Sequence, residues 1–408
     1  MGNEIAAKRF NYWFGLINLI AVFCIVWFLW YIFMNPNTVM KLYTPSYGFS
    51  LMIVFVYGIV LMRNVVDYTS FIDRVPLQNV IWRGIVLTIV SILLMYVLVY
   101  LVFWNFIGRL GIAYFSPASI VAGGGIGAEP FSARENASIA IIYLFTAFLW
   151  VSLAWSVGFG RWPWQNSKPG VFAWSRVFVI SFFSAIIYIL MFHPHVGYLF
   201  YPAQSKAAVS PWWADMAGTG SAFFGLALAL SALFWIIVSD MHWDGYPWKL
   251  FEKDGEGTCL KGVLTFVFTL IFGIIMMYIL SKIMNGVWDE AFVGGQYTDG
   301  PDFRFLHIAQ ISGFFILAVY ILKHFFNNFP NMDSLWLRSI IRTIIALAIG
   351  MLIYWFYYSP LTTFFLARVQ GFGQPDDNSL VWTLLFLSII MIQFEFFEGW
   401  PLRRKGSS

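Results

Sequence analysis

Long apolar runs recur along the whole chain, and every second run ends in a short segment that contains a proline. Each segment has a small, acidic or amide residue three positions before the proline, and an aromatic residue or Val directly before it. The prolines recur at roughly 80 residues, which is the length of one helical hairpin in a membrane. Proline is also a common stop after any membrane helix. The pattern predicts five diverged hairpins that end near Pro76, Pro163, Pro247, Pro330 and Pro401.

The composition places the chain in a membrane. Of its 408 residues, 60% are hydrophobic and only 11% are charged, whereas soluble domains have roughly 25% charged residues. The sequence therefore predicts an all-α integral membrane protein with about ten transmembrane helices, arranged as five repeated hairpins with pseudo-five-fold symmetry. Residues 1–408 form a single polytopic domain in this reading. The predicted helices cover residues 11–33, 48–66, 80–104, 137–158, 172–192, 220–239, 261–284, 304–325, 336–358 and 379–397.

The basic residues indicate an orientation. Most of the 24 Lys and Arg residues lie on the side that holds the N-terminus. The positive-inside rule then places both termini in the cytoplasm, and we expect the protein in the plasma (inner) membrane. Cys24 is expected within the membrane and Cys259 in a cytoplasmic loop, so the two cannot form a disulfide. The basic residues on the other side are Lys41, Arg109, Arg134, Lys206, Lys282, Arg304 and Arg368.

The odd-numbered predicted helices carry a small or polar residue at a similar depth. Four of them carry a basic residue near their start, and a small or polar residue follows eight positions after it. Eight residues of helix rise about 12 Å, a little short of the bilayer midplane. If these helices form an inner ring, the residues line one path for a solute. The predicted path consists of Asn18, Ser91, Ser184, Thr269 and Gly350, with a second layer at Thr88, Ser181 and Thr265.

Two other interpretations of these residues remain open. Ser and Thr in membrane helices often donate a hydrogen bond to their own helix, and small residues let helices pack closely. The even-numbered helices also carry small residues, for example Gly225, Ser231 and Gly313. The inverse arrangement, with the even-numbered helices inside, is therefore an alternative.

Charged residues gather where the helices end on the predicted cytoplasmic side. Asp240 and Glu395 end the helices that precede two of the proline segments. Arg63 and Asp67 are spaced i, i+4, which favours a local ion pair on one helix. All of these charges lie within reach of the interface. Because no charge falls at mid-membrane, a proton pump with a central carboxylate is disfavoured.

Histidines offer one possible metal site. His193, His195 and His307 are expected on the outer side, where Asp289 or Glu290 could complete a ligand set. The spacing of these residues has no specificity, and the prediction is that no cofactor or metal is bound. The sequence also lacks the common hydrolase, zinc-protease, P-loop and dinucleotide-binding motifs.

The ten-helix, five-hairpin plan resembles the tellurite-resistance/dicarboxylate transporter and slow-anion-channel family. The resemblance covers the predicted topology and not sequence motifs, so no residue role is carried over. It implies five hairpins around a central pore lined by the odd-numbered helices.

The leading functional hypothesis is a channel, facilitator or transporter for a small solute, and not an enzyme. The alternative is a membrane-bound enzyme, or the membrane subunit of a complex, that acts on a lipid or quinone. A third hypothesis is a structural subunit with a dry, packed axis. The expected partners are the lipid bilayer and a small solute, without nucleic acid, and an oligomer or a membrane complex remains open.

Overall fold

The computed structural model describes residues 12–35, 37–71, 77–110, 112–125, 128–165, 173–192, 220–287, 303–366 and 378–401. In these ranges the chain is helical, as predicted, and a helix lies in each of the ten expected segments. Nine of the described helical segments are long and apolar enough to cross a membrane, and a tenth, Leu380–Phe396, is shorter. These helices confirm the prediction of a helical membrane protein.

Turns and loops separate the long helices, and five of these helices end in a π-helical segment. The long helices fall into two groups that alternate along the chain. The first group comprises α1 (Tyr12–Leu29), α3 (Val80–Tyr96), α6 (Ala173–Phe192), α10 (Cys259–Val287) and α12 (Leu335–Tyr357). The second group comprises α2 (Tyr47–Val60), α5 (Pro130–Leu153), α9 (Gly220–Met241), α11 (Phe303–His324) and α14 (Leu380–Met391). Two short helices, α4 (Pro117–Gly123) and α13 (Pro360–Leu366), lie at the opposite end of the bundle from the proline segments.

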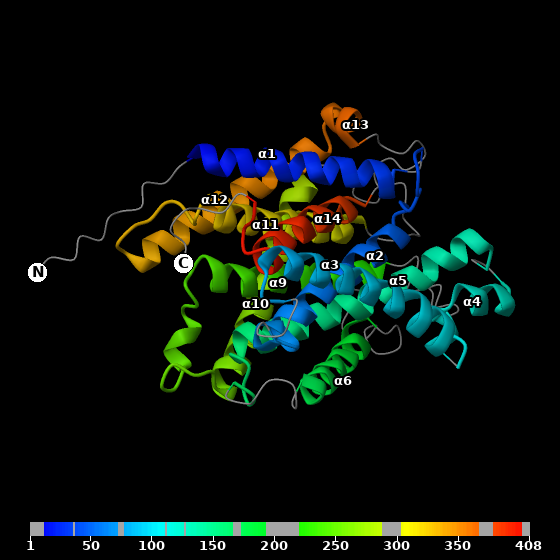
Figure 1. The fold of residues 1–408 in the computed structure, drawn as a ribbon, viewed down its shortest axis with the longest axis horizontal. Coiled ribbons are helices and arrows are strands. Elements are labelled where there is room, and N and C mark those ends of the chain that lie inside the picture. Colours follow the sequence, from blue (N-terminus) through cyan, green and yellow to red (C-terminus); the bar gives the residue numbers. More distant parts are fainter. Residues whose placement is uncertain are drawn as a thin grey trace, which may run out of the picture.

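The two groups form two layers. Helices of the second group are mostly buried. In the most apolar 18-residue stretch of each helix, 94% of the residues of α11 are buried, but only 17% of those of the helix that starts with α3. In the inner layer α2 contacts α5, α5 contacts α9, α9 contacts α11, α11 contacts α14, and α14 returns to α2. The five inner helices therefore form a closed ring. Figure 1 shows α9, α11 and α14 in the middle of the molecule, with α1 and α6 on opposite sides.

The layer assignment corrects the predicted arrangement. Each outer helix packs on one side against the ring, and its other side exposes large apolar residues such as Trp174, Phe178 and Leu352. Such surfaces suit lipid, because hydrocarbon tails solvate apolar side chains. The odd-numbered helices thus form the outer layer, and the even-numbered helices form the inner ring. The inner position of odd-numbered helices that the family resemblance implies does not hold for the described helices.

Four of the proline segments have the same backbone form, and the fifth, around Pro76, lies outside the described residues. In each, the residues three and two positions before the proline have left-handed φ values between 49° and 82°. The second of these donates its N–H to the carbonyl oxygen six residues earlier, at 2.7–3.1 Å. This bond closes the helix end and satisfies a carbonyl group that has no partner within the helix. The four segments are Gly160–Pro163, Asp244–Pro247, Asn327–Pro330 and Glu398–Pro401.

Basic residues near the start of four outer helices attach these helices to the end of the bundle that carries the proline segments, called here the proline-turn end. Each side chain reaches a carboxylate or a backbone carbonyl group at the end of an inner helix or in the loop that follows it. Because these cations are mostly buried, each needs such a partner. The contacts are Arg83 with Glu398, Arg176 with the carbonyl oxygen of Trp164, Lys261 with Glu252, and Arg342 with the carbonyl oxygen of His242.

Glycine allows close contact between the layers, for example at Gly350. A Cβ atom on Gly350 of α12 would lie 2.4 Å from Cδ1 and 3.1 Å from Cα of Phe315 in α11. At Gly58 of α2, by contrast, the nearest atom would lie 3.6 Å away. We expect Gly350→Ala to lower the free energy of unfolding by about 1–3 kcal/mol, because the Phe315 backbone cannot easily move. The matched Gly58→Ala variant should be nearly neutral, and thermal unfolding in detergent measures both. Equal melting temperatures for the two variants would contradict this packing.

Candidate functional site

A polar cavity opens at the proline-turn end of the ring. It has a volume of about 270 Å³ and lies among the ends of α2, α5 and α9 and the loop after α9. This size suits a molecule smaller than a typical drug, whose pockets start at about 300 Å³. We call this cavity the vestibule. Its lining residues are Asn64, Ser156, Val157, Gly160, Arg161, Asp240, Gly245, Lys249, Glu252 and Lys261.

The last turns of three inner helices carry polar residues to this end of the ring. In α2, α5 and α14 the last turn is π-helical, over Leu61–Val65, Ala154–Gly158 and Ile392–Phe396. A π turn shifts the side chains that follow it relative to an α-helix, and such turns are frequent at functional sites. The polar side chains that these turns carry are Arg63 and Asn64, Ser156, and Gln393 and Glu395.

Ion pairs and hydrogen bonds connect the helices around the vestibule. Arg63 Nε lies 2.7 Å from Glu395 Oε2, which joins α2 to α14. The Asn64 amide donates to the Ser156 hydroxyl at 3.0 Å, which joins α2 to α5. Because these contacts cross between neighbouring helices, they fix the width of the ring at this end.

The predicted local pair between Arg63 and Asp67 is wrong. The helical part of α2 ends at Val65, and Asp67 adopts a left-handed backbone with φ 57°. Its carboxylate therefore points to another element and lies 3.0 Å from Arg161. The i, i+4 spacing suggested a contact within one helix, but that helix ends between the two residues.

Asp240 is the carboxylate of the vestibule that has no ion pair or hydrogen bond within the described part of the chain. It lies at the end of α9, and its exposed side chain lines the cavity. The cations that act on it most strongly are Lys323, Lys261 and Lys249, in that order. Asp240 is thus a carboxylate that faces the cavity and has lysines around it.

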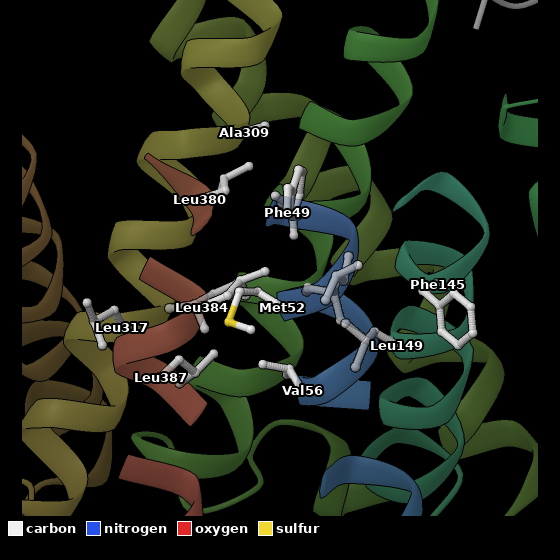
Figure 2. Close-up of a cluster of buried hydrophobic side chains, with 14 of the residues drawn as sticks. Phe49, Met52, Val56, Phe145, Leu149, Ala309, Leu317, Leu380, Leu384 and Leu387 are labelled. Atoms are coloured by element: carbon white, nitrogen blue, oxygen red, sulfur yellow. The ribbon is translucent and has the colours of Figure 1, made fainter. Parts of the chain in front are cut away.

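Apolar side chains fill the space between α2 and α14 in the inner ring. Figure 2 shows Phe49, Met52 and Val56 of α2 facing Leu384 and Leu387 of α14. All five side chains are at most 9% exposed. These side chains belong to the large buried apolar cluster of the described residues. We call these five residues the axial plug. A hydrophobic constriction of this kind can exclude water and act as a gate.

The residues of the predicted path lie elsewhere. They belong to the outer helices and are turned toward the inner layer, so they are spread around the ring and do not face one another. Gly350 packs against Phe315, and Asn18 accepts a hydrogen bond from Gln393 at 3.1 Å. Ser181 is half-buried on α6. The remaining hydroxyls donate to the carbonyl oxygen four residues earlier, at 2.6–2.9 Å, in Ser91, Ser184, Thr269, Thr88 and Thr265.

Removing such hydroxyls should leave solute flux unchanged. In Ser184→Ala and Thr269→Ala the side chain loses a hydrogen bond to its own helix, and each helix keeps its backbone bonds. We expect both variants to keep wild-type flux in liposomes and to lose at most about 1 kcal/mol of stability. A large loss of flux in a folded variant would contradict this prediction and would indicate that the solute path follows the outer helices.

The histidines proposed as metal ligands are only partly described. His193 and His195 lie outside the described residues. His307 is buried on α11, where its ring centroid lies 5.9 Å from that of Tyr358. Within the described ranges no group of three or more His, Cys, Asp or Glu residues could hold a metal ion.

Burial of His242 predicts a pH dependence of the free energy of unfolding. It follows α9, is fully buried, and burial lowers the pKa of its imidazole from 6.5 to about 4. Below pH 6.5 the unfolded chain binds a proton that the folded protein rejects. Stability should therefore fall between pH 6.5 and 4, by at most about 1.4 kcal/mol per pH unit from this group. The difference in melting temperature between pH 7.5 and pH 5 should be smaller in His242→Asn than in wild type. An unchanged difference would contradict the assignment.

Two apolar clefts open sideways from the bundle. One, of about 480 Å³, lies among α5, α6 and α10 and includes Trp155, Trp162 and Trp164. The other, of about 590 Å³, lies among α1, α11, α12 and α14 and includes Leu317 and Trp382. Both have the size of a binding pocket for an apolar chain.

Comparisons with protein-family models, with curated proteins and with solved structures gave no match. The functional assignment therefore depends on the geometry of this chain.

Proposed function

We propose that the protein is a channel or facilitator for a small polar solute, with a path along the axis of the inner ring. The vestibule carries this proposal, because it gives solutes a polar entrance at the end of a closed ring of helices. Charged side chains at a membrane-embedded ring are costly to desolvate and most often serve binding or passage. The axial plug then corresponds to the closed state, and a small displacement of α2 against α14 would open it.

The repeat arrangement is part of the same proposal. We propose ten membrane helices in five hairpins, each with one inner and one outer helix. The common backbone of the four described proline segments supports this, as does the attachment of four outer helices through basic residues. The proline-turn end, with its many Lys and Arg residues, would face the cytoplasm of the plasma (inner) membrane.

The test is uptake by purified protein in liposomes. Glycerol, urea, glycine and K⁺ are supplied in turn, and entry is followed by swelling or by isotope. We expect uptake of at least one solute above protein-free liposomes, reduced by Asn64→Trp, which narrows the vestibule. Lys253→Trp, in the loop after α9 but outside the vestibule lining, serves as the control. If no solute enters in any condition, the structural-subunit hypothesis replaces the channel.

A membrane-bound enzyme that acts on a lipid or quinone is the second candidate. The two lateral apolar clefts favour it, since an isoprenoid or acyl chain fits such a volume. A stoichiometric transition metal in purified protein, lost in His193→Ala, would support this alternative.

A further inference from the structure

Two opposite charges in the vestibule lack an ion pair, although the charges beside them are paired. Asp240 is one, and Lys249, in the loop after α9, is the other. Neither takes part in an ion pair in the described part of the chain, whereas Arg161 and Lys261 are each bound to a carboxylate. The cavity thus offers one carboxylate and one ammonium group that are ready for a ligand.

The turn around Gly245 places Lys249. A Cβ atom at Gly245 would lie 3.0 Å from Cε of Lys249, so the glycine leaves room for the lysine stem against the turn. The Lys249 ammonium also lies 5.9 Å from the centroid of the Tyr246 ring, within the range of a cation–π contact. These contacts keep the ammonium at the cavity and do not neutralise it.

The chemistry of this pair selects a ligand that carries both charges. A simple anion at Lys249 would face the carboxylate of Asp240, and a simple cation at Asp240 would face Lys249 and Lys323. A zwitterion satisfies both groups at once, and like-charge contacts reject the singly charged competitors. The neighbouring Asn64 amide and Ser156 hydroxyl can bond its polar atoms. A volume of about 270 Å³ limits the ligand to a small molecule.

We propose that the vestibule binds a small amino-acid zwitterion, with the ligand's ammonium on Asp240 and its carboxylate on Lys249. This inference rests on the proposed function, because it names the substrate class of the same cavity. Glycine, β-alanine and 4-aminobutyrate span a range of charge separations, and the cavity should prefer one of them.

The experiment is calorimetric titration of the purified full-length protein in detergent with these three zwitterions. Acetate and methylammonium, which carry only one of the two charges, are the comparison ligands. We expect saturable binding of at least one zwitterion, and affinity at least about tenfold weaker for both single-charge probes. Asp240→Asn and Lys249→Gln should each weaken zwitterion binding by more than about tenfold.

Two further variants show whether a loss of binding comes from the missing charge or from misfolding. Lys253→Gln removes an exposed lysine of the same loop that does not line the cavity, and it should bind as wild type does. The double variant with Asp240→Lys and Lys249→Asp exchanges the two charges, so the zwitterion can bind in the reverse direction. Partial recovery of binding in the double variant supports the proposal, and its absence in a folded double variant contradicts the charge pairing.

Binding and passage are read separately. Zwitterion binding without flux in liposomes would leave this inference standing and reject the proposed path. Flux with no saturable zwitterion binding, or equal binding of acetate and glycine, would overturn the inference and leave the path intact.

Discussion

Replacing Leu384 by asparagine should open the proposed axial path to water and small solutes. Leu384 faces Met52 across the space between α14 and α2, in the middle of the axial plug (Figure 2). A polar amide at this position lowers the cost of placing water between the two helices, so the dry constriction should hydrate. We expect the permeability of protein-containing liposomes to glycerol and glycine to rise at least about tenfold, because hydration of the constriction removes its barrier to polar solutes.

The matched control is Leu317→Asn. Leu317, like Leu384, is a buried leucine on an inner helix, but it lines the lateral cleft among α1, α11, α12 and α14. Both variants bury an unpaired amide and should lose similar stability, so stability alone cannot explain a difference in flux. Equal permeability of the two folded variants would mean that the axis is not the path.

Replacing Arg342 by methionine should give the largest loss of stability. Arg342 is 4% exposed, and its guanidinium donates to the carbonyl oxygens of His242 and Pro330, both at 3.2 Å, and to Asn331 Oδ1 at 2.7 Å. Methionine fills much of the volume but leaves these acceptors without their donor. We expect a loss of about 3–5 kcal/mol, typical of breaking a buried hydrogen-bonded charge. The melting temperature in detergent measures it.

Two controls separate charge from geometry. Arg342→Lys keeps the charge but cannot reach three acceptors with one ammonium, so it should recover only part of the loss. Arg338, four residues earlier on α12, is 24% exposed and pairs with Asp244 at 2.6 Å. A pair this accessible contributes at most about 1 kcal/mol, so Arg338→Gln should be mild. If Arg338→Gln were as damaging as Arg342→Met, burial of the Arg342 network would not be the cause.

The positions of the helices could be predicted from the sequence, because a membrane requires apolar runs of a fixed length. Their layer could not. In water, polar residues mark the outside of a helix, but lipid tails are as apolar as a protein core. Ser91 and Thr269 on outer helices look like Ser231 and Ser312 on inner helices, and the two inner hydroxyls lie 3.1 Å apart. The sequence therefore predicts how deep in the membrane a residue lies, but it does not predict whether a small residue faces the inner layer or the lipid.

The vestibule was only partly accessible to prediction. Asp240 and Glu395 could be recognised as charges at helix ends, because a charge at the end of an apolar run is visible in any sequence. Their proximity depends on closure of the ring. The ring brings the C-terminal ends of α9 and α14 to the proline-turn end, and α2 lies between α14 and α5. The pairing of Arg63 with Glu395 joins residues 332 positions apart. No local spacing reports such a contact.

The axial path is tested most directly by a single cysteine in the vestibule. In a Cys24→Ser, Cys259→Ser background, Ser156→Cys places a thiol on the wall of the vestibule, and Lys253→Cys places one outside it at the same end. A bulky charged methanethiosulfonate reagent labels each protein, and liposome flux is measured before and after labelling. The axial path predicts that labelled Ser156→Cys loses its flux while labelled Lys253→Cys keeps it. Full flux through completely labelled Ser156→Cys would contradict the path.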